Sequence, residues 1–101
     1  MKMQMRGETL LVSEIKELGA ATSNDFRDQV RAAYSRDGVR NLEIDLSATM
    51  FVDSCGLGAL VALHKTVCGR NGAIRLLNPT PGVLQLLELT RMHRIFDIVK
   101  N

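Results

Sequence analysis

The stretch Asp53-Ser54-Cys55-Gly56-Leu57-Gly58 places a hydroxyl beside a carboxylate where a strand-like run gives way to an apolar, helix-like run. The first turn of a helix carries free N–H groups and a partial positive charge, which together stabilise an anion. A phosphate on Ser54 would add about 1.5 to 2 negative charges at neutral pH. This hexapeptide, residues 53–58, therefore indicates a site for a reversible charge.

Ser54 also has a purely structural interpretation as the N-cap of the helix. In that role its hydroxyl accepts a hydrogen bond from a backbone N–H and stabilises the helix by about 1 kcal/mol. Asp53 is either a polar residue at the end of the strand or the group that orients the Ser54 hydroxyl for a partner enzyme. Gly56 and Gly58 remove side chains next to Ser54 and so let another macromolecule come close. Close packing of the helix on a sheet is their structural alternative, and Gly58 is a candidate for it.

Two cysteines, Cys55 and Cys68, lie thirteen positions apart inside one predicted helix, too far apart to form a disulfide with each other. Cys55 fits either a thiol of lowered pKa that senses oxidants or, as we favour, a small buried packing residue. Residues 1–6 lack the apolar core of a secretory signal. Together with unpaired cysteines, this predicts a cytoplasmic protein.

The sequence argues against a catalytic site, a nucleotide-binding site or a zinc site. A hydrolase nucleophile turn needs glycine where Val52 stands, and His64 lies ten residues beyond Ser54 along the same helix, about 15 Å by helical rise. The segment Gly56-Leu57-Gly58 lacks the third glycine of the dinucleotide pattern. His64, His93 and the two cysteines contain no close-spaced ligand pair for zinc. We therefore predict no enzymatic activity, no metal and no cofactor.

The composition predicts one compact domain over residues 1–101. The chain is 46% hydrophobic and 24% charged, and no window reaches the apolar length of a membrane span. Thirteen Lys and Arg residues against eleven Asp and Glu residues give a net charge of only +2. Because the basic residues are scattered and aromatics are few, we expect no direct binding of nucleic acid.

Hydrophobic periodicity predicts strands alternating with helices. Alternating or short apolar runs predict strands at residues 2–5, 10–12, 42–46, 50–52, 73–77 and 95–99. Helical spacing predicts an amphipathic helix from Thr22 or Ser23 until Asp37-Gly38, a second from Ser54 until Gly69, and a third over residues 83–89 with Pro81 near its first turn. This order predicts an α/β layer whose central strands are parallel.

The run Phe51-Val52-Asp53-Ser54-Cys55-Gly56-Leu57-Gly58, between a strand and an apolar helix, resembles the STAS domain of bacterial anti-sigma factor antagonists. The similarity covers nearly the whole chain, and Asp-Ser-x-Gly-Leu-Gly is its most specific part. The resemblance implies the STAS fold, a mixed central sheet of about four to five strands with helices packed on it.

The same resemblance implies a partner-switching mechanism. An unphosphorylated antagonist binds an anti-sigma factor and frees a sigma factor for transcription. The anti-sigma factor is also a serine kinase that phosphorylates the residue matching Ser54, and a metal-dependent serine phosphatase removes the phosphate. The partner-binding positions carried over are Asp53, Ser54, Gly56, Leu57 and Gly58, with Cys55 inside the same segment.

Two positions depart from the family pattern. Gly19 stands where members often carry an aspartate near the phosphorylation site, and Cys55 replaces a more usual Ser or Thr.

The family also contains constitutive structural subunits of lipid-transport ATPases or signalling assemblies, in which Ser54 would chiefly be an N-cap. A small Ser- or Cys-dependent hydrolase is the third alternative.

Overall fold

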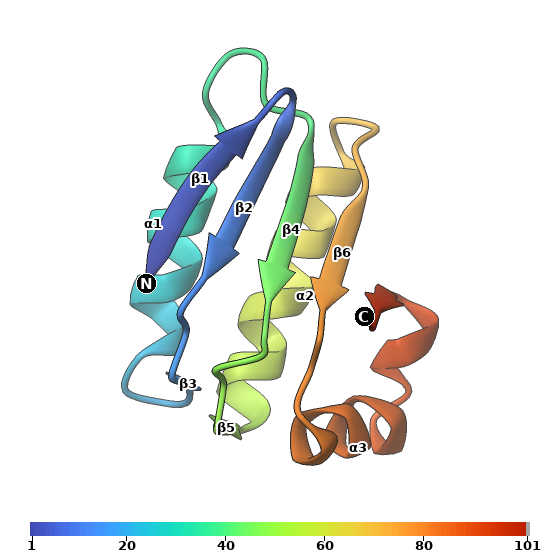
Figure 1. Cartoon of the computed structure of the whole chain (residues 1–101). Helices are drawn as coiled ribbons and strands as arrows, with labels where there is room; N and C mark the ends of the chain where they lie inside the picture. The colour runs from blue at the N-terminus through green and yellow to red at the C-terminus, as the bar shows by residue number, and fades with distance from the viewer. Residues whose placement is uncertain (101) are drawn as a thin grey trace.

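The central sheet has five strands among residues 1–100, the part of the chain that a computed structural model describes. Their bounds are β1 Lys2–Arg6, β2 Thr9–Ser13, β4 Asn41–Asp45, β6 Ile74–Leu77 and β7 Asp97–Val99. They lie in the order β1-β2-β4-β6-β7 (Figure 1). Strands β1 and β2 form an antiparallel hairpin, and the other neighbouring pairs are parallel. The predicted mixed sheet with parallel central strands is therefore confirmed.

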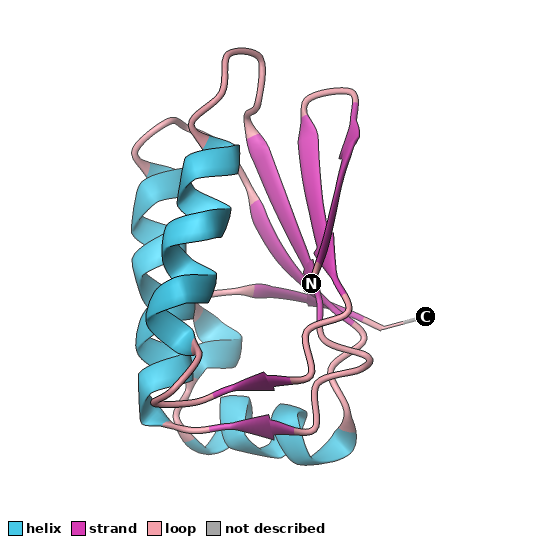
Figure 2. Cartoon of the chain, turned by 90° about the vertical axis from the view of Figure 1, so that its left-hand side faces the viewer, coloured by secondary structure: helices cyan, strands magenta, loops and turns pink. Residues whose placement is uncertain are grey.

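Helices cover one face of this sheet. Within residues 1–100 the three α-helices are α1 Ser23–Tyr34, α2 Ser54–Cys68 and α3 Pro81–Leu89. Helices α1 and α2 lie side by side against one face, and the described chain leaves the opposite face open (Figure 2). The open face is polar: Arg75 forms ion pairs with Glu43 at 3.6 Å and with Asp97 at 3.3 Å. Both pairs are partly exposed to solvent and so contribute little stability.

The core lies between the sheet and helices α1 and α2. In β4, Leu42 and Ile44 are fully buried on the helix side, and Glu43 between them points to the open face, as the two-residue period of a strand requires. The helices add side chains at spacings of three and four residues. Their fully or nearly fully buried apolar residues include Phe26, Val30, Tyr34, Leu60, Leu63 and Val67.

A second, two-stranded parallel sheet joins β3 Glu17–Leu18 to β5 Phe51–Val52. The sequence predicts a strand over residues 50–52, and it pairs with β3 rather than with the central sheet. Strand β3 itself is not predicted, because two residues are too few to show a period. Backbone pairing of Glu17 with Phe51 and of Leu18 with Val52 brings the segment before α1 next to the start of α2.

The helix boundaries agree closely with the sequence prediction. Helix α1 ends at Tyr34, three residues before Asp37, and α3 begins at Pro81 itself. The final strand begins at Asp97 rather than at residue 95, because a short 3-10 helix, η1 Met92–Arg94, comes first. The two cysteines are free, as predicted. No helix within residues 1–100 combines the length and apolarity that a membrane crossing requires.

Candidate functional site

Asp53 is the residue that caps helix α2. Its backbone is extended (φ −115°, ψ −170°), and its Oδ1 accepts hydrogen bonds from the N–H of Cys55 at 2.9 Å and of Gly56 at 3.1 Å. Ser54 is the first helical residue, so its interpretation as the N-cap is wrong. The aspartate is one residue earlier and supplies a charged acceptor, which the positive end of the helix favours.

The other carboxylate oxygen of Asp53 ties the helix to the neighbouring segment. Its Oδ2 accepts a hydrogen bond from the N–H of Ala20 at 3.1 Å, and the Asp53 N–H donates to the carbonyl of Leu18 at 3.1 Å. Asp53 thus connects β5, the start of α2 and the loop after β3. No hydrogen bond among residues 1–100 joins its carboxylate to the Ser54 hydroxyl. In this structure the Asp53 side chain therefore fixes the positions of backbone N–H groups.

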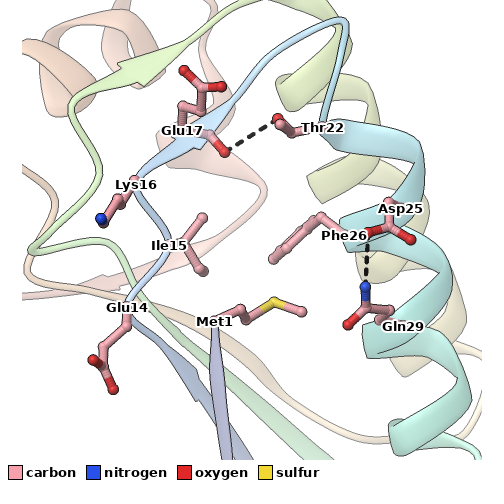
Figure 3. Close-up of a pocket in the computed structure, with 9 residues that line it drawn as sticks. All are labelled: Met1, Glu14, Ile15, Lys16, Glu17, Thr22, Asp25, Phe26 and Gln29. Atoms are coloured by element: carbon pink, nitrogen blue, oxygen red, sulfur yellow. Dashed lines mark hydrogen bonds between the residues drawn. The ribbon is translucent and has the colours of Figure 1, made fainter.

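The loop that receives Asp53 is closed by Thr22. The Gly19 N–H donates to Thr22 Oγ1 at 3.0 Å, and Thr22 Oγ1 donates to the Glu17 carbonyl at 3.3 Å (Figure 3). Thr22 occupies the N-cap position of α1, as predicted, but its hydroxyl bonds within this loop rather than to the helix. The loop that meets Asp53 is therefore held in shape before α1 begins.

The two glycines of the hexapeptide have opposite surroundings. A Cβ at Gly56 would overlap the carbonyl oxygen of Leu18 and lie 2.8 Å from the Leu18 Cβ. A Cβ at Gly58 would have no neighbouring atom within 4 Å. Close packing therefore requires glycine at Gly56, and the expectation that Gly58 serves this purpose is wrong.

Some residues of the hexapeptide are buried and others are exposed to solvent. Gly56 and Leu57 are buried, whereas Ser54, Cys55 and Gly58 are exposed. The expectation that Cys55 is a buried packing residue is therefore wrong. Because helical residues two positions apart point in different directions, the contact of Gly56 with Leu18 turns Ser54 and Gly58 toward solvent.

Gly19 lies directly beside the capping carboxylate. It is buried, and a Cβ there would lie 2.9 Å from Cε2 of Phe51 and 3.3 Å from Oδ2 of Asp53. The Phe51 ring thus occupies the space next to this departure from the family pattern. Phe51 is 52% exposed and Met50 is 83% exposed, so two large apolar side chains border the start of α2.

A cavity of about 410 Å³ opens between residues 14–17 and the start of α1. Met1, Ile15 and Phe26 point toward one another in it, and the carboxylates of Glu14 and Asp25 stand at its rim (Figure 3). The Asp25 carboxylate accepts a hydrogen bond from Gln29 at 2.7 Å. The residues of the hexapeptide do not line this cavity, so it is separate from the Ser54 site.

Within residues 1–100, no histidine interacts with Ser54. His64 lies further along α2 and interacts with Cys68 and with the Phe96 ring instead. Residues 1–100 contain no group of three or more His, Cys, Asp or Glu side chains arranged to hold a metal ion. The geometry around Ser54 therefore provides an exposed acceptor hydroxyl without the rest of a nucleophilic triad.

Leu18 and Ala20 are site residues that sequence reasoning missed. Leu18 offers the carbonyl against which Gly56 packs, and Ala20 offers the N–H that Asp53 binds. Both act through backbone atoms, which leave no side-chain signature. The glycine at position 56 signals a close contact but carries no information about its partner.

An open sheet face and an exposed serine on a capped helix characterise a small α/β protein whose candidate site lies on its surface. The STAS domain model matches residues 1–101, and the chain belongs to the STAS domain family. A STAS-domain containing protein of Pseudomonas aeruginosa is 30% identical over 94 residues, covering 91% of this chain and 89% of that protein. The anti-sigma F factor antagonist of Paenibacillus polymyxa is 27% identical over 100 residues, covering 99% and 86%.

Solved structures agree with this assignment of the fold. A putative anti-sigma factor antagonist of Thermotoga maritima has a TM-score of 0.92 at 24% identity, covering 99% of this chain and 86% of that chain. The antagonist SpoIIAA in its unphosphorylated form has a TM-score of 0.85 at 20% identity, with the same coverage. Proteins of this antagonist class bind partners and are not enzymes, and this chain is a non-enzymatic member of the family.

Proposed function

We propose that the chain is a cytoplasmic anti-sigma factor antagonist whose binding is switched off by phosphorylation of Ser54. The unphosphorylated form binds an anti-sigma factor that is also a serine kinase. That kinase phosphorylates Ser54, the complex separates, and a metal-dependent serine phosphatase regenerates the binding form. The observation that carries the proposal is the exposed Ser54 at the start of a helix that Asp53 already caps.

The division of the hexapeptide gives the switch a physical basis. Asp53 already occupies the N–H groups of Cys55 and Gly56, so a phosphate on Ser54 would not find these two donors free. Its charge would stand beside the Asp53 carboxylate on the outer side of the helix, where a partner must approach. A new charge of about −2 in a close contact adds desolvation and like-charge repulsion. The complex is weakened while the fold keeps its cap.

The surface around Ser54 suits a protein partner. The exposed Gly58 has no side chain and open space above it, so a partner backbone can approach α2 one helical turn beyond Ser54. The exposed apolar side chains of Met50 and Phe51 flank the helix start on the β5 side. We assign the outer surface formed by Met50, Phe51, Ser54, Cys55 and Gly58 as the contact with the anti-sigma factor.

Phosphorylation with a purified candidate anti-sigma factor kinase and ATP tests the proposal. Intact mass should show one added phosphate on the wild-type chain and none on Ser54→Ala. Ser47→Ala is the matched control, since Ser47 is also an exposed serine and lies outside the hexapeptide. It should gain phosphate at the wild-type rate.

Two results would contradict the proposal. Phosphate on Ser54→Ala at the wild-type level would place the modification elsewhere. A wild-type chain that binds the kinase domain and gains no phosphate would favour a constitutive structural STAS subunit.

A further inference from the structure

Strand β1 forms one edge of the central sheet and has a neighbouring strand on one side only (Figure 1). It pairs with β2 along its whole length, from Lys2 opposite Ser13 to Arg6 opposite Thr9. The strand at the other edge, β7, has only three residues, whereas β1 has five. Within residues 1–100, β1 therefore presents the longer edge of the central sheet.

The register of the hairpin decides which backbone groups of β1 are free. Arg6 and Thr9 pair directly across a two-residue turn. Such a pair exchanges backbone hydrogen bonds, and bonded and non-bonded pairs then alternate along an antiparallel ladder. Every second residue of β1, counted from Arg6, therefore bonds toward β2. The N–H and C=O groups of Met3 and Met5 point the other way, where a further strand can pair with them.

The side chains of these two methionines lie on the helix side of the sheet. Met3 is opposite Val12 and Met5 is opposite Leu10, and both partners are buried in the core. Met3 packs partly buried against that core, and Met5 is 45% exposed. A hollow of about 230 Å³ lies beside them and extends to Ala33 of α1. It offers an added strand room for an apolar side chain.

The edge also carries positive charge that has no partner. Because side chains alternate along a strand, Lys2 and Arg6 lie on the open face of β1, and Arg36 lines the hollow on the helix side. Strand β2 contains no charged residue, and Glu8 and Glu14 flank it. In the described part of the chain, none of the three cations forms an ion pair.

A second copy of this chain fits the edge poorly. Antiparallel pairing of two β1 strands over their full length would place Lys2 of one copy directly opposite Arg6 of the other. Like charges directly opposite one another destabilise a pair of strands, and opposite charges stabilise it. The charges of β1 thus disfavour self-pairing and favour a strand that carries carboxylates at these two positions.

We propose that the β1 edge binds an extended acidic segment of another protein, which adds to the central sheet as a further strand. The segment carries Asp or Glu opposite Lys2 and Arg6, and apolar residues opposite Met3 and Met5. Its pattern is therefore acidic, apolar, any residue, apolar, acidic. Main-chain hydrogen bonds supply the affinity in this mode of binding, and the alternating side chains supply the specificity.

An NMR titration of the isotope-labelled chain with two short peptides tests the proposal. One peptide is centred on Glu-Val-Thr-Val-Glu, and the other has Lys in place of both Glu residues. At low ionic strength, where surface charges are least screened, the acidic peptide should shift the amide signals of Met3 and Met5 most. It should bind about tenfold more tightly than the basic peptide. Equal binding of the two peptides, or no binding of the acidic one, would overturn the proposal.

Charge reversal at the edge should invert this preference. Lys2→Glu/Arg6→Glu should bind the basic peptide about tenfold more tightly than the acidic peptide. Arg94→Glu/Lys100→Glu is the matched control, because it changes the net charge equally at exposed positions outside β1. It should keep the preference of the wild-type chain. Inversion in this control as well would show that the total charge, rather than the β1 edge, attracts the peptide.

Met5→Pro tests the backbone contribution. Proline removes the N–H that points away from β2 and leaves the hydrogen bonds of the hairpin in place, as proline on an edge strand can. Binding of the acidic peptide should weaken about tenfold relative to Met5→Ala, which keeps the N–H. Equal binding by the two variants would show that the peptide does not extend the sheet.

Peptide N-methylation keeps the backbone test independent of the fold of Met5→Pro. Methyl groups on alternate peptide amides should abolish binding for one set of positions and leave it unchanged for the other, because only one set faces β1. Equal effects of the two sets would overturn the proposal. So would a wild-type dimer, seen by sedimentation without peptide, in which the Met3 and Met5 amides are protected from exchange. Ser54 is not part of this edge, so neither result affects the proposed function.

Discussion

The inner and outer sides of the first turn of α2 differ sharply, although they are made by neighbouring residues. On the inner side, Gly56 packs against the backbone of Leu18, and Asp53 holds three backbone N–H groups. On the outer side, Ser54 is exposed and Gly58 has open space around it. The same short motif therefore contains residues that pack against β3 and residues that are exposed to solvent.

Under the proposed switch, this difference would allow a phosphate to be added to Ser54 without refolding of the domain. If Ser54 were the N-cap, a phosphate would replace a hydroxyl that the helix needs. Because Asp53 caps the helix, the Ser54 side chain is not needed as an N-cap. Substitutions at Gly56, Asp53, Gly58 and Ser54 distinguish the inner side from the outer side.

Gly56→Ala should cause the largest loss of stability. The added methyl group would meet the Leu18 carbonyl, which is backbone and cannot rotate away, so the helix start must move from β3. We expect the free energy of unfolding to fall by about 3 kcal/mol, at the upper end of ordinary overpacking. Urea denaturation measures it. A change below the error of that measurement would show that the inner side is not tightly packed.

Asp53→Ala should have the next largest effect. It removes an N-cap, worth about 1 kcal/mol, and leaves the Ala20 N–H without its acceptor. We expect the free energy of unfolding to fall by about 2 kcal/mol in total. Asp53→Asn should lose less, because its amide oxygen can still accept the hydrogen bonds that one of the two carboxylate oxygens accepts. Thermal and urea unfolding of both variants provide the comparison. Equal losses in the two variants would indicate that the charge, rather than the hydrogen bonds, stabilises the junction.

Gly58→Ala should change stability in the opposite direction. Glycine in a helix interior is less favourable than alanine by about 1 kcal/mol, and the new methyl group meets no neighbour. The isolated protein should become more stable by about 0.5 to 1 kcal/mol while its affinity for the anti-sigma factor falls. The affinity is measured by calorimetry. A stabilised variant with unchanged affinity would remove Gly58 from the contact surface.

Ser54→Ala should have the smallest effect on folding. The exposed hydroxyl is not the helix cap, so the free energy of unfolding should stay within about 0.5 kcal/mol of wild type. Ser54→Gly is the companion variant, and it should lose about 0.5 kcal/mol through helix propensity alone. A loss near 1 kcal/mol in Ser54→Ala would restore Ser54 as a capping residue and contradict the division between the two sides.

Periodicity in the sequence was enough to predict the central architecture. The alternation of residues 42–46 and the helical spacing of residues 54–68 correspond to β4 and α2, and the parallel order of the central strands follows from their alternation. Strand β3 could not be predicted, because it consists of two residues whose partner lies more than thirty positions away. Its placement depends on tertiary packing.

The site was predictable in its location but not in its internal division. The sequence identified Asp53 to Gly58 as a helix start, and it gave no means to decide which glycine faces inward. That choice depends on where the Leu18 backbone lies. The sequence offered Ser54 as a possible N-cap, and serine and aspartate are about equally good N-caps. The backbone angles of Asp53 and its hydrogen bonds from Cys55 and Gly56 show that the aspartate is the cap.

The affinity for the anti-sigma factor before and after phosphorylation tests the central claim most directly. Calorimetry should compare the unmodified chain, the chain phosphorylated on Ser54, and Ser54→Ala treated with the same kinase. Unfolding curves of the same samples report on the fold. We predict that phosphorylation lowers the affinity at least tenfold with little change in unfolding, and that treated Ser54→Ala binds like the unmodified chain. Equal affinities for the phosphorylated and unmodified chains, or a loss of affinity that accompanies unfolding, would contradict the account.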